Sequence, residues 1–239
     1  MTKEHAYAES AIGPDIPIVE AHHHLWPGDR YDRSDLERDI SQGHRVIKTV
    51  FIDCSANYRA HGPDHLKPVG ETEWVLSQQG TDGICAGIVG HADMYLGSRA
   101  GEVLDAHLEA GGRSFKGIRH NVAWDRHPDT NNALRGAPEF ALLDPTFQAG
   151  TAEIAKRGLL FETWLYFNQL SDMKKLAQIC FAIEAFGPER SMFETNYPED
   201  GHLTDYVVLW NTFKRIAADF SADERLWVFE KTARSVYNI

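Results

Sequence analysis

The chain has 239 residues, of which 43% are hydrophobic and 25% are charged, a composition typical of a folded domain with one substantial core. Its 35 acidic side chains outnumber the 24 basic ones and give a formal net charge of -11, which repels nucleic acid. No run approaches the roughly 18 apolar residues of a membrane helix, and the polar start lacks the apolar core of a signal peptide. The three cysteines lie far apart. We therefore expect a cytoplasmic protein with reduced thiols that binds neither nucleic acid nor membranes.

Short apolar runs alternate along the chain with longer stretches of helical pattern. The runs that we predict to be strands are Ile16–Ala21, Val46–Asp53, Ile84–Ala92, Phe115–Asn121, Leu159–Tyr166 and Ser191–Asn196. The predicted helices are Ser98–Ala110, Asp144–Arg157, Ser171–Phe186, Thr204–Phe220 and a last helix that begins at the capping box Ser221–Glu224. Such alternation predicts parallel strands covered by helices, in a doubly wound sheet or a barrel. No glycine-rich nucleotide-binding loop follows the first strand, and polar residues gather where strands end, so we predict one α/β, TIM-barrel-like (β/α) domain.

The first candidate site is the sequence VEAHHHLW, residues Val19–Trp26, at the end of the first predicted strand. Residues i and i+2 of a strand point to the same side, so His22 and His24 can direct their imidazoles to one point. Two such imidazoles form half of a divalent-metal site. The alternative is a surface loop that happens to contain three histidines, and spacing alone leaves both readings open. A purification tag is excluded, because the run follows the apolar strand residues Ile16–Val19.

A second candidate site is FKGIRH, residues Phe115–His120, at the end of the fourth predicted strand. Neighbouring residues of a strand face opposite sides, so only one of Arg119 and His120 can face the barrel axis. An arginine there could bind a substrate carboxylate through two hydrogen bonds. A salt bridge on the surface is the alternative reading.

Other polar residues also stand where predicted strands end. His91 closes the third strand, Tyr166 and Gln169 close the fifth, and the last strand delivers Asn196 and then Asp200. Each alone is a weak indication, because polar loop residues are usually only solvated. Their common position at the carboxyl ends of parallel strands predicts that they share one rim of the barrel.

Taken together, the segments VEAHHHLW, CAGIVGHADM, FKGIRH, WLYFNQL and FGPERSMFETNYPED resemble the amidohydrolase-related family, in particular its lactone-hydrolysing branch. The resemblance implies a (β/α)8 barrel with His22 and His24 as metal ligands. Relatives usually carry an acidic metal ligand and general base where this chain has Asn196, and Asp200 is the nearest carboxylate that could replace it. The predicted site is completed by His120 for catalysis and by Trp26, His91, Arg119, Tyr166 and Gln169 for substrate binding.

The sequence departs from the family pattern after the fifth strand. Relatives read Tyr-His-Pro-Gln there, whereas this chain reads Tyr166-Phe167-Asn168-Gln169, and their next histidine-bearing strand has no counterpart. Only one predicted helix separates the fifth strand from the last. Six strands are predicted where the family has eight. Two β/α units, of about 30 residues each, are therefore missing between about residues 170 and 187. We therefore predict an incomplete barrel of about six strands, whose exposed edges favour a homo-oligomer.

The resemblance implies a hydrolase of small carboxylated or sugar-derived lactones that activates water. The alternatives are a catalytically inactive binding or assembly homologue and a metal-dependent decarboxylase of the same superfamily, which would require an aspartate in place of Asn196. Zinc is the expected divalent metal. Because the Asn196 amide is neutral and one histidine strand is missing, we expect the metal to be weakly held or absent and hydrolysis to be slow.

Overall fold

The computed structural model describes residues 9–28, 30–127, 130, 137–166, 169, 189, 192–202, 204–218 and 220–239, with the backbone alone at 200, 202 and 216. By its internal contacts the chain forms two compact units. The first unit consists of Met1–Asn57, Val75–Gly87 and Phe186–Ile239, and the second of Tyr58–Trp74 and Ile88–Ala185. No helix within these described ranges is long and apolar enough to cross a membrane.

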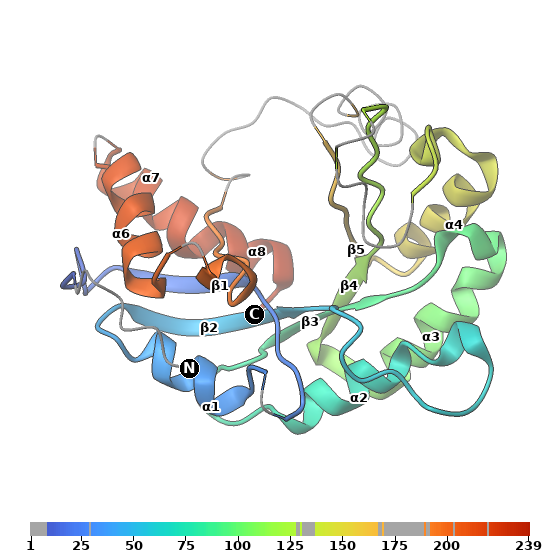
Figure 1. The fold of residues 1–239 in the computed structure, drawn as a ribbon, viewed down its shortest axis with the longest axis horizontal. Helices are drawn as coiled ribbons and strands as arrows, with labels where there is room; N and C mark the ends of the chain where they lie inside the picture. The colour runs from blue at the N-terminus through green and yellow to red at the C-terminus, as the bar shows by residue number, and fades with distance from the viewer. Residues whose placement is uncertain are drawn as a thin grey trace. The chain divides into compact units, whose positions relative to one another are not determined.

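Five parallel strands form the sheet, in which they follow one another in chain order (Figure 1). They are β1 (Pro17–His23), β2 (Arg45–Ile52), β3 (Gly87–His91), β4 (Phe115–Arg119) and β5 (Leu160–Glu162). A helix follows each of the first four strands. This alternation is the α/β class with the element order of an incomplete TIM barrel, which confirms the predicted fold class.

The helices within the described ranges are mostly short. They are α1 (Arg33–Ile40), α2 (Val69–Ser77), α3 (Ala100–Gly111), α4 (Pro145–Lys156), α6 (Tyr206–Ile216), α7 (Ala222–Leu226) and α8 (Thr232–Tyr237). Short 3-10 segments are η1 (Asp64–Leu66), η2 (Met94–Arg99), η3 (Gly112–Ser114), η4 (Ala141–Leu143) and η7 (Glu199–His202), and η8 (Trp227–Lys231) is a turn of π-helix between α7 and α8.

Two helix starts confirm the predictions made from capping residues. The Asp144 carboxylate accepts from the backbone N–H groups of Thr146 and Phe147 at 2.7 and 3.1 Å and begins α4. Ser221 and Glu224 form the predicted capping box of α7. Capping of this kind satisfies N–H groups that a helix leaves without an internal partner. The predicted helix Ser171–Phe186 lies outside the described residues.

The predicted sixth strand, Ser191–Asn196, is wrong over its described part, residues 192–196, which contain no strand. A single parallel bridge joins His23 to Tyr197 instead. Two causes are visible. Asn196 has a left-handed backbone (φ 52°), which interrupts an extended chain, and the Thr195 N–H donates to the side chain of Glu20 rather than to a neighbouring strand.

Aromatic packing in the first unit fixes the segment that replaces this strand. The Phe193 ring stacks on Phe213 of α6 at 4.8 Å between ring centroids and lies 5.2 Å from Phe229 of η8. The Phe193 N–H also donates to the Val228 carbonyl at 3.0 Å. Since η8 and α8 pack on β1 (Figure 1), these contacts hold residues 192–197 beside the end of β1.

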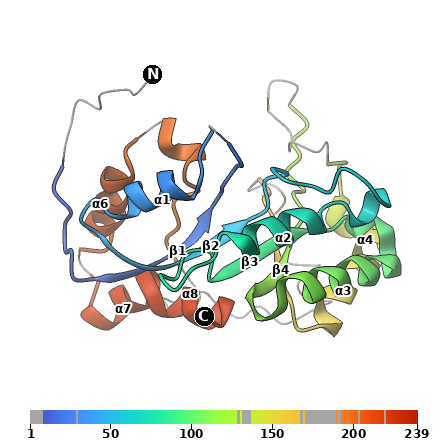
Figure 2. The same ribbon diagram turned by 90° about the horizontal axis from the view of Figure 1, so that it is seen from below.

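In the second unit α3 and α4 lie side by side (Figure 2). Arg157 joins them, because its guanidinium contacts Asp105 of α3 at 2.6 Å and Glu153 of α4 at 2.9 Å. Gly150 allows α4 to pack directly on η2, since a Cβ at this position would stand 2.3 Å from the Met94 carbonyl oxygen.

Candidate functional site

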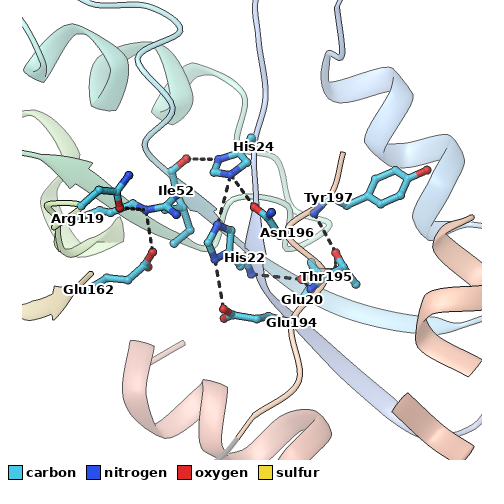
Figure 3. Close-up of polar contacts among 11 residues, drawn as sticks. Glu20, His22, His24, Ile52, Arg119, Glu162, Glu194, Thr195, Asn196 and Tyr197 are labelled. Carbon is cyan, nitrogen blue, oxygen red and sulfur yellow. Dashed lines mark hydrogen bonds and ion pairs between the residues drawn. The ribbon is translucent and has the colours of Figure 1, made fainter. Parts of the chain in front are cut away.

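The end of β1 directs two histidines to one point. His22 and His24 lie on one side of the chain, and their Nε2 atoms stand 3.3 Å apart (Figure 3). His23 faces the other side, where its ring is fully buried, 6.0 Å from the Phe51 ring and with Nε2 3.9 Å from the Cys85 sulfur. The alternation of a strand therefore brings His22 and His24 together as predicted, while their role as metal ligands stays a prediction.

The outer ring nitrogen of each histidine is held by an oxygen. His24 Nδ1 lies 2.8 Å from the Ile52 carbonyl oxygen at the end of β2, and His22 Nδ1 lies 3.3 Å from Oε1 of Glu194. A carbonyl and a carboxylate only accept, so both Nδ1 atoms carry a proton. In the neutral tautomers the two facing Nε2 atoms then carry lone pairs, so their 3.3 Å contact requires a shared proton or a cation between them.

Asn196 completes what we call the converging cluster, consisting of His22, His24 and Asn196. Its Oδ1 lies 3.1 Å from His24 Nε2. The left-handed backbone of Asn196 turns the side chain toward β1 (Figure 3), and asparagine tolerates that conformation better than most residues. Two imidazole nitrogens and an amide oxygen thus converge, a set of donors suited to a cation.

The cluster has dimensions that fit zinc. With Zn–N bonds of about 2.0–2.1 Å, two ligands of a tetrahedral site are about 3.3 Å apart, which is the distance between the two Nε2 atoms. The outer contacts to Glu194 and Ile52 resemble those that orient metal-binding histidines in general. A set of three or more His, Cys, Asp or Glu side chains suited to a metal is absent from the described ranges, so the third donor here is the Asn196 amide.

Glu20 of β1 anchors the backbone on which the cluster stands. The carboxylate is fully buried and accepts from four groups: the N–H of His22, the N–H and hydroxyl of Thr195, and the hydroxyl of Tyr206, at 2.6–3.2 Å. Burial raises the pKa of Glu20 to about 7, against the lowering by the Thr195 and His22 hydrogen bonds. Because Thr195 stands between Glu194 and Asn196, Glu20 fixes the positions of both.

Trp26 and Arg30 line the loop that leaves the cluster. The Trp26 ring lies 5.8 Å from the His24 ring, and the Arg30 guanidinium lies over the same indole, 3.7 Å from the ring centre. Arg30 also pairs with Glu199 of η7. Of the predicted substrate-binding residues, Trp26 is the one that the structure places in contact with the cluster within the first unit. Asp200 has a side chain outside the described set.

The other predicted site residues belong to the second unit. His91 and His120 are neighbours, with ring centroids 5.5 Å apart. His120 Nδ1 accepts from the Met94 N–H at 3.1 Å, and His91 Nδ1 donates to the Arg119 carbonyl at 2.8 Å. The Arg119 side chain is only 14% exposed and pairs with Glu162 at 3.2 Å. The structure therefore gathers these three residues at the ends of β3 and β4, and their catalytic or binding roles stay predictions.

The side chain of Gln169 forms hydrogen bonds with backbone groups of the same chain. Its Oε1 accepts from the N–H groups of Trp124 and Tyr166 at 2.9 and 3.1 Å, and its Nε2 donates to the Val122 carbonyl at 2.8 Å. These bonds join the segments after β4 and β5 and bring Gln169 and Tyr166 together. Both residues lie beyond the end of β5, which is shorter than predicted. Phe167 and Asn168 lie outside the described residues.

Three residues of the first unit were not foreseen: Glu20, Glu194 and Arg30. The two glutamates could have been found by extending the two-residue period. Glu20, His22 and His24 stand at every second position of the sequence, and so do Glu194 and Asn196. Arg30 carries no such signal, because its position depends on the turn that the Trp26 N–H closes by donating to the Tyr31 carbonyl at 2.8 Å.

The fold and the converging cluster define a class: α/β proteins of the TIM-barrel kind with a histidine pair where the first strand ends. No family model matches the sequence. Among curated proteins, an uncharacterized protein from Sinorhizobium fredii is 26% identical over 308 aligned residues, covering 94% of this chain and 99% of that protein.

Comparison with solved structures shows which known proteins share this fold. A zinc-bound crystal structure of an amidohydrolase from Burkholderia multivorans matches with a TM-score of 0.68 at 16% identity, over 93% of this chain and 99% of that one. A putative 2-pyrone-4,6-dicarboxylic acid hydrolase from Pseudomonas putida matches with a TM-score of 0.62 at 12% identity, over 93% and 98%. The chain therefore shares the fold of these solved structures.

Proposed function

We propose that the protein hydrolyses small carboxylated or sugar-derived lactones by activating water at the converging cluster. The observation that carries this proposal is the convergence of two imidazole nitrogens and an amide oxygen, with the Nε2 atoms 3.3 Å apart and each Nδ1 held by an oxygen. A shared fold alone would not support an activity. The proposal rests on the geometry of these side chains.

His22, His24 and Asn196 would hold a zinc ion. Bound there, zinc would supply Lewis-acid polarisation of the ester carbonyl. Support comes from the fit of the cluster to a tetrahedral site and from the zinc in the similar B. multivorans structure. The neutral Asn196 amide makes this a weaker site than one with a carboxylate. Asp200 remains a proposed activator of water.

The same geometry also gives His22 the means to move a proton. Its Nδ1 is held by the Glu194 carboxylate, which fixes the tautomer with a basic Nε2 and stabilises the charged ring once Nε2 has taken a proton. Carboxylate–imidazole pairs act in this way in many hydrolases. In protein without bound metal, His22 Nε2 can thus remove a proton from water that attacks a lactone carbonyl, whereas an Nε2 that binds zinc has no lone pair left for a proton.

The choice of substrate follows from the comparison with the P. putida protein, whose name refers to a dicarboxylated cyclic ester. A lactone is a good substrate for a site with few groups, because ring opening needs only an activated water and a polarised carbonyl. The ring oxygen leaves as a hydroxyl of the same product.

The test is a panel of lactones with and without carboxylates, assayed by acid release in weakly buffered indicator, together with the zinc content of the purified protein. We expect slow turnover that His22→Ala abolishes. His61→Ala is the matched control, because His61 is an exposed histidine of the second unit. Removal of the metal with a chelator distinguishes the two proposed roles of His22. Turnover that is lost with the metal indicates a zinc ligand, and turnover that remains indicates a base.

Two outcomes would contradict the proposal. If no lactone is opened by protein loaded with zinc, the chain is the inactive binding homologue. If His22→Ala and His61→Ala retain equal turnover, hydrolysis occurs elsewhere in the molecule.

A further inference from the structure

The loop between β1 and α1 brings a positive charge to Trp26, whose ring neighbours the converging cluster. The N–H of Trp26 donates to the Tyr31 carbonyl at 2.8 Å and closes a turn. This turn brings the Arg30 guanidinium to 3.7 Å from the centre of the Trp26 ring. The same ring lies 5.8 Å from the ring of His24. Arg30 and His24 therefore contact one indole.

A cation at this place has chemical consequences in so acidic a protein. The formal charge of the chain is -11, and the cluster itself is bordered by the carboxylate of Glu194. A substrate with a carboxylate is repelled by such a field unless a positive group receives it. Arginine suits this task, because its planar fork matches a carboxylate with two parallel hydrogen bonds.

The present partner of Arg30 is easily replaced. Arg30 and Glu199 are 59% and 43% exposed, and an ion pair between exposed groups contributes only about 0–1 kcal/mol. Stacking on Trp26 holds the guanidinium plane in place when the carboxylate partner changes. In the second unit, by contrast, Arg119 is 14% exposed and bonded to both Glu162 and Asn121, so its ion pair is harder to exchange.

We propose that Arg30, supported by Trp26, binds the carboxylate of the substrate and thereby selects carboxylated over neutral lactones. Glu199 forms an ion pair with the guanidinium until substrate binds. This inference rests on the proposed function and names the substrate class of the same site. It makes Arg30 a specificity-determining residue.

The experiment compares 2-pyrone-4,6-dicarboxylate with uncharged 2-pyrone. Both compounds contain the same lactone ring, and only the first carries carboxylates. For Arg30→Gln we expect kcat/KM to fall about 10- to 100-fold for the dicarboxylate, as loss of a charge-assisted pair predicts, and to stay unchanged for 2-pyrone. For Glu199→Gln we expect KM for the dicarboxylate to fall, by up to about fivefold. Arg38→Gln is the control for net charge, because Arg38 is 64% exposed on α1 and pairs with Asp35.

The outcomes separate this inference from the proposed function. Equal losses in Arg30→Gln and Arg38→Gln, or equal losses for both compounds, overturn the role of Arg30 and leave lactone hydrolysis standing. If the wild type opens neither ring, the proposed function fails, and binding of the dicarboxylate measured by calorimetry decides the inference. Binding weakened about 10- to 100-fold by Arg30→Gln alone supports it, whereas no binding, or equal binding by both proteins, overturns it.

Discussion

Each unit of the molecule contains buried histidines, and their ring nitrogens have different hydrogen-bond partners in the two units. In the converging cluster of the first unit the Nδ1 atoms are held from outside, and the Nε2 atoms face each other at 3.3 Å. In the second unit His107 has both nitrogens bonded. Its Nδ1 accepts from the Thr72 hydroxyl at 2.8 Å, and its Nε2 donates to the His91 carbonyl at 2.9 Å.

The difference separates a histidine suited to chemistry from one that stabilises the fold. His107 is fully buried and stacks on Phe115 at 4.9 Å between ring centroids. Burial lowers its pKa to about 4, so it stays neutral over the physiological range. His22 and His24 are buried nearly as deeply, so burial alone does not distinguish the two kinds. What distinguishes them is whether lone pairs of different side chains are directed to one point.

The largest expected effect is the loss of a member of the converging cluster. His24→Ala removes the imidazole that contacts both His22 and Asn196, so we expect zinc affinity to fall more than about 100-fold, beyond the cost of an outer-contact change. Competition with a chromophoric chelator measures this affinity. Binding that survives both His24→Ala and His22→Ala would show that the cluster is as structural as His107.

The next effect concerns the support beneath the cluster. Glu20→Ala leaves the Thr195 hydroxyl and the Tyr206 hydroxyl buried without their acceptor, so we expect a loss of about 3 kcal/mol in the free energy of unfolding. Thr195→Val removes one donor and is expected to cost about 1 kcal/mol. Urea unfolding followed by fluorescence measures both variants. Equal, small losses would mean that Glu20 is not the anchor of the Asn196 segment.

The buried His107 makes the free energy of unfolding depend on pH. Its pKa is about 4 in the folded protein and about 6.5 in an unfolded chain, so the unfolded state binds more protons between these values. Stability from this group is therefore complete above pH 6.5 and decreases as the pH falls toward 4, by up to about 3 kcal/mol. His107→Gln cannot titrate. The advantage of the wild type over this variant in urea unfolding should shrink over that window, and a constant difference would contradict the assignment.

The sequence predicts those parts of the fold that depend on local pattern. The alternation in VEAHHHLW placed His22 and His24 on one side, and the capping residues Asp144 and Ser221 marked true helix starts. Helix α1 was missed because only Leu36 and Asp39 of its eight residues are buried, which leaves no apolar period. Its signal is a capping box, made by Asp32 and Asp35.

The parts of the site that escaped prediction depend on contacts between distant residues. Glu20 binds Thr195 across 175 positions of sequence, and this contact turns a predicted strand into an irregular segment that carries Asn196. Local periodicity contains no information about such a partner. The outer contact of His22 with Glu194 is of the same kind, since a carboxylate in a loop is ordinarily only solvated.

The smallest expected effect is a gain. Asn196→Asp changes one atom of the side chain and should keep the fold, since aspartate also tolerates the left-handed backbone that Asn196 adopts at φ 52°. It replaces a neutral amide oxygen, 3.1 Å from His24 Nε2, by a charged one, so we expect zinc to bind about tenfold more tightly. The chelator competition assay measures the change at a pH at which the histidines are neutral.

The control for this gain is the same substitution in protein that carries His22→Ala. If Asn196 and the histidines hold one ion together, the gain should largely disappear when His22 is missing, because the carboxylate then lacks the second imidazole of the site. A gain of equal size in both backgrounds would come from the added negative charge alone. In that case the facing Nε2 atoms of His22 and His24 share a proton rather than a metal, and the chemistry of the first unit is that of the His22–Glu194 pair.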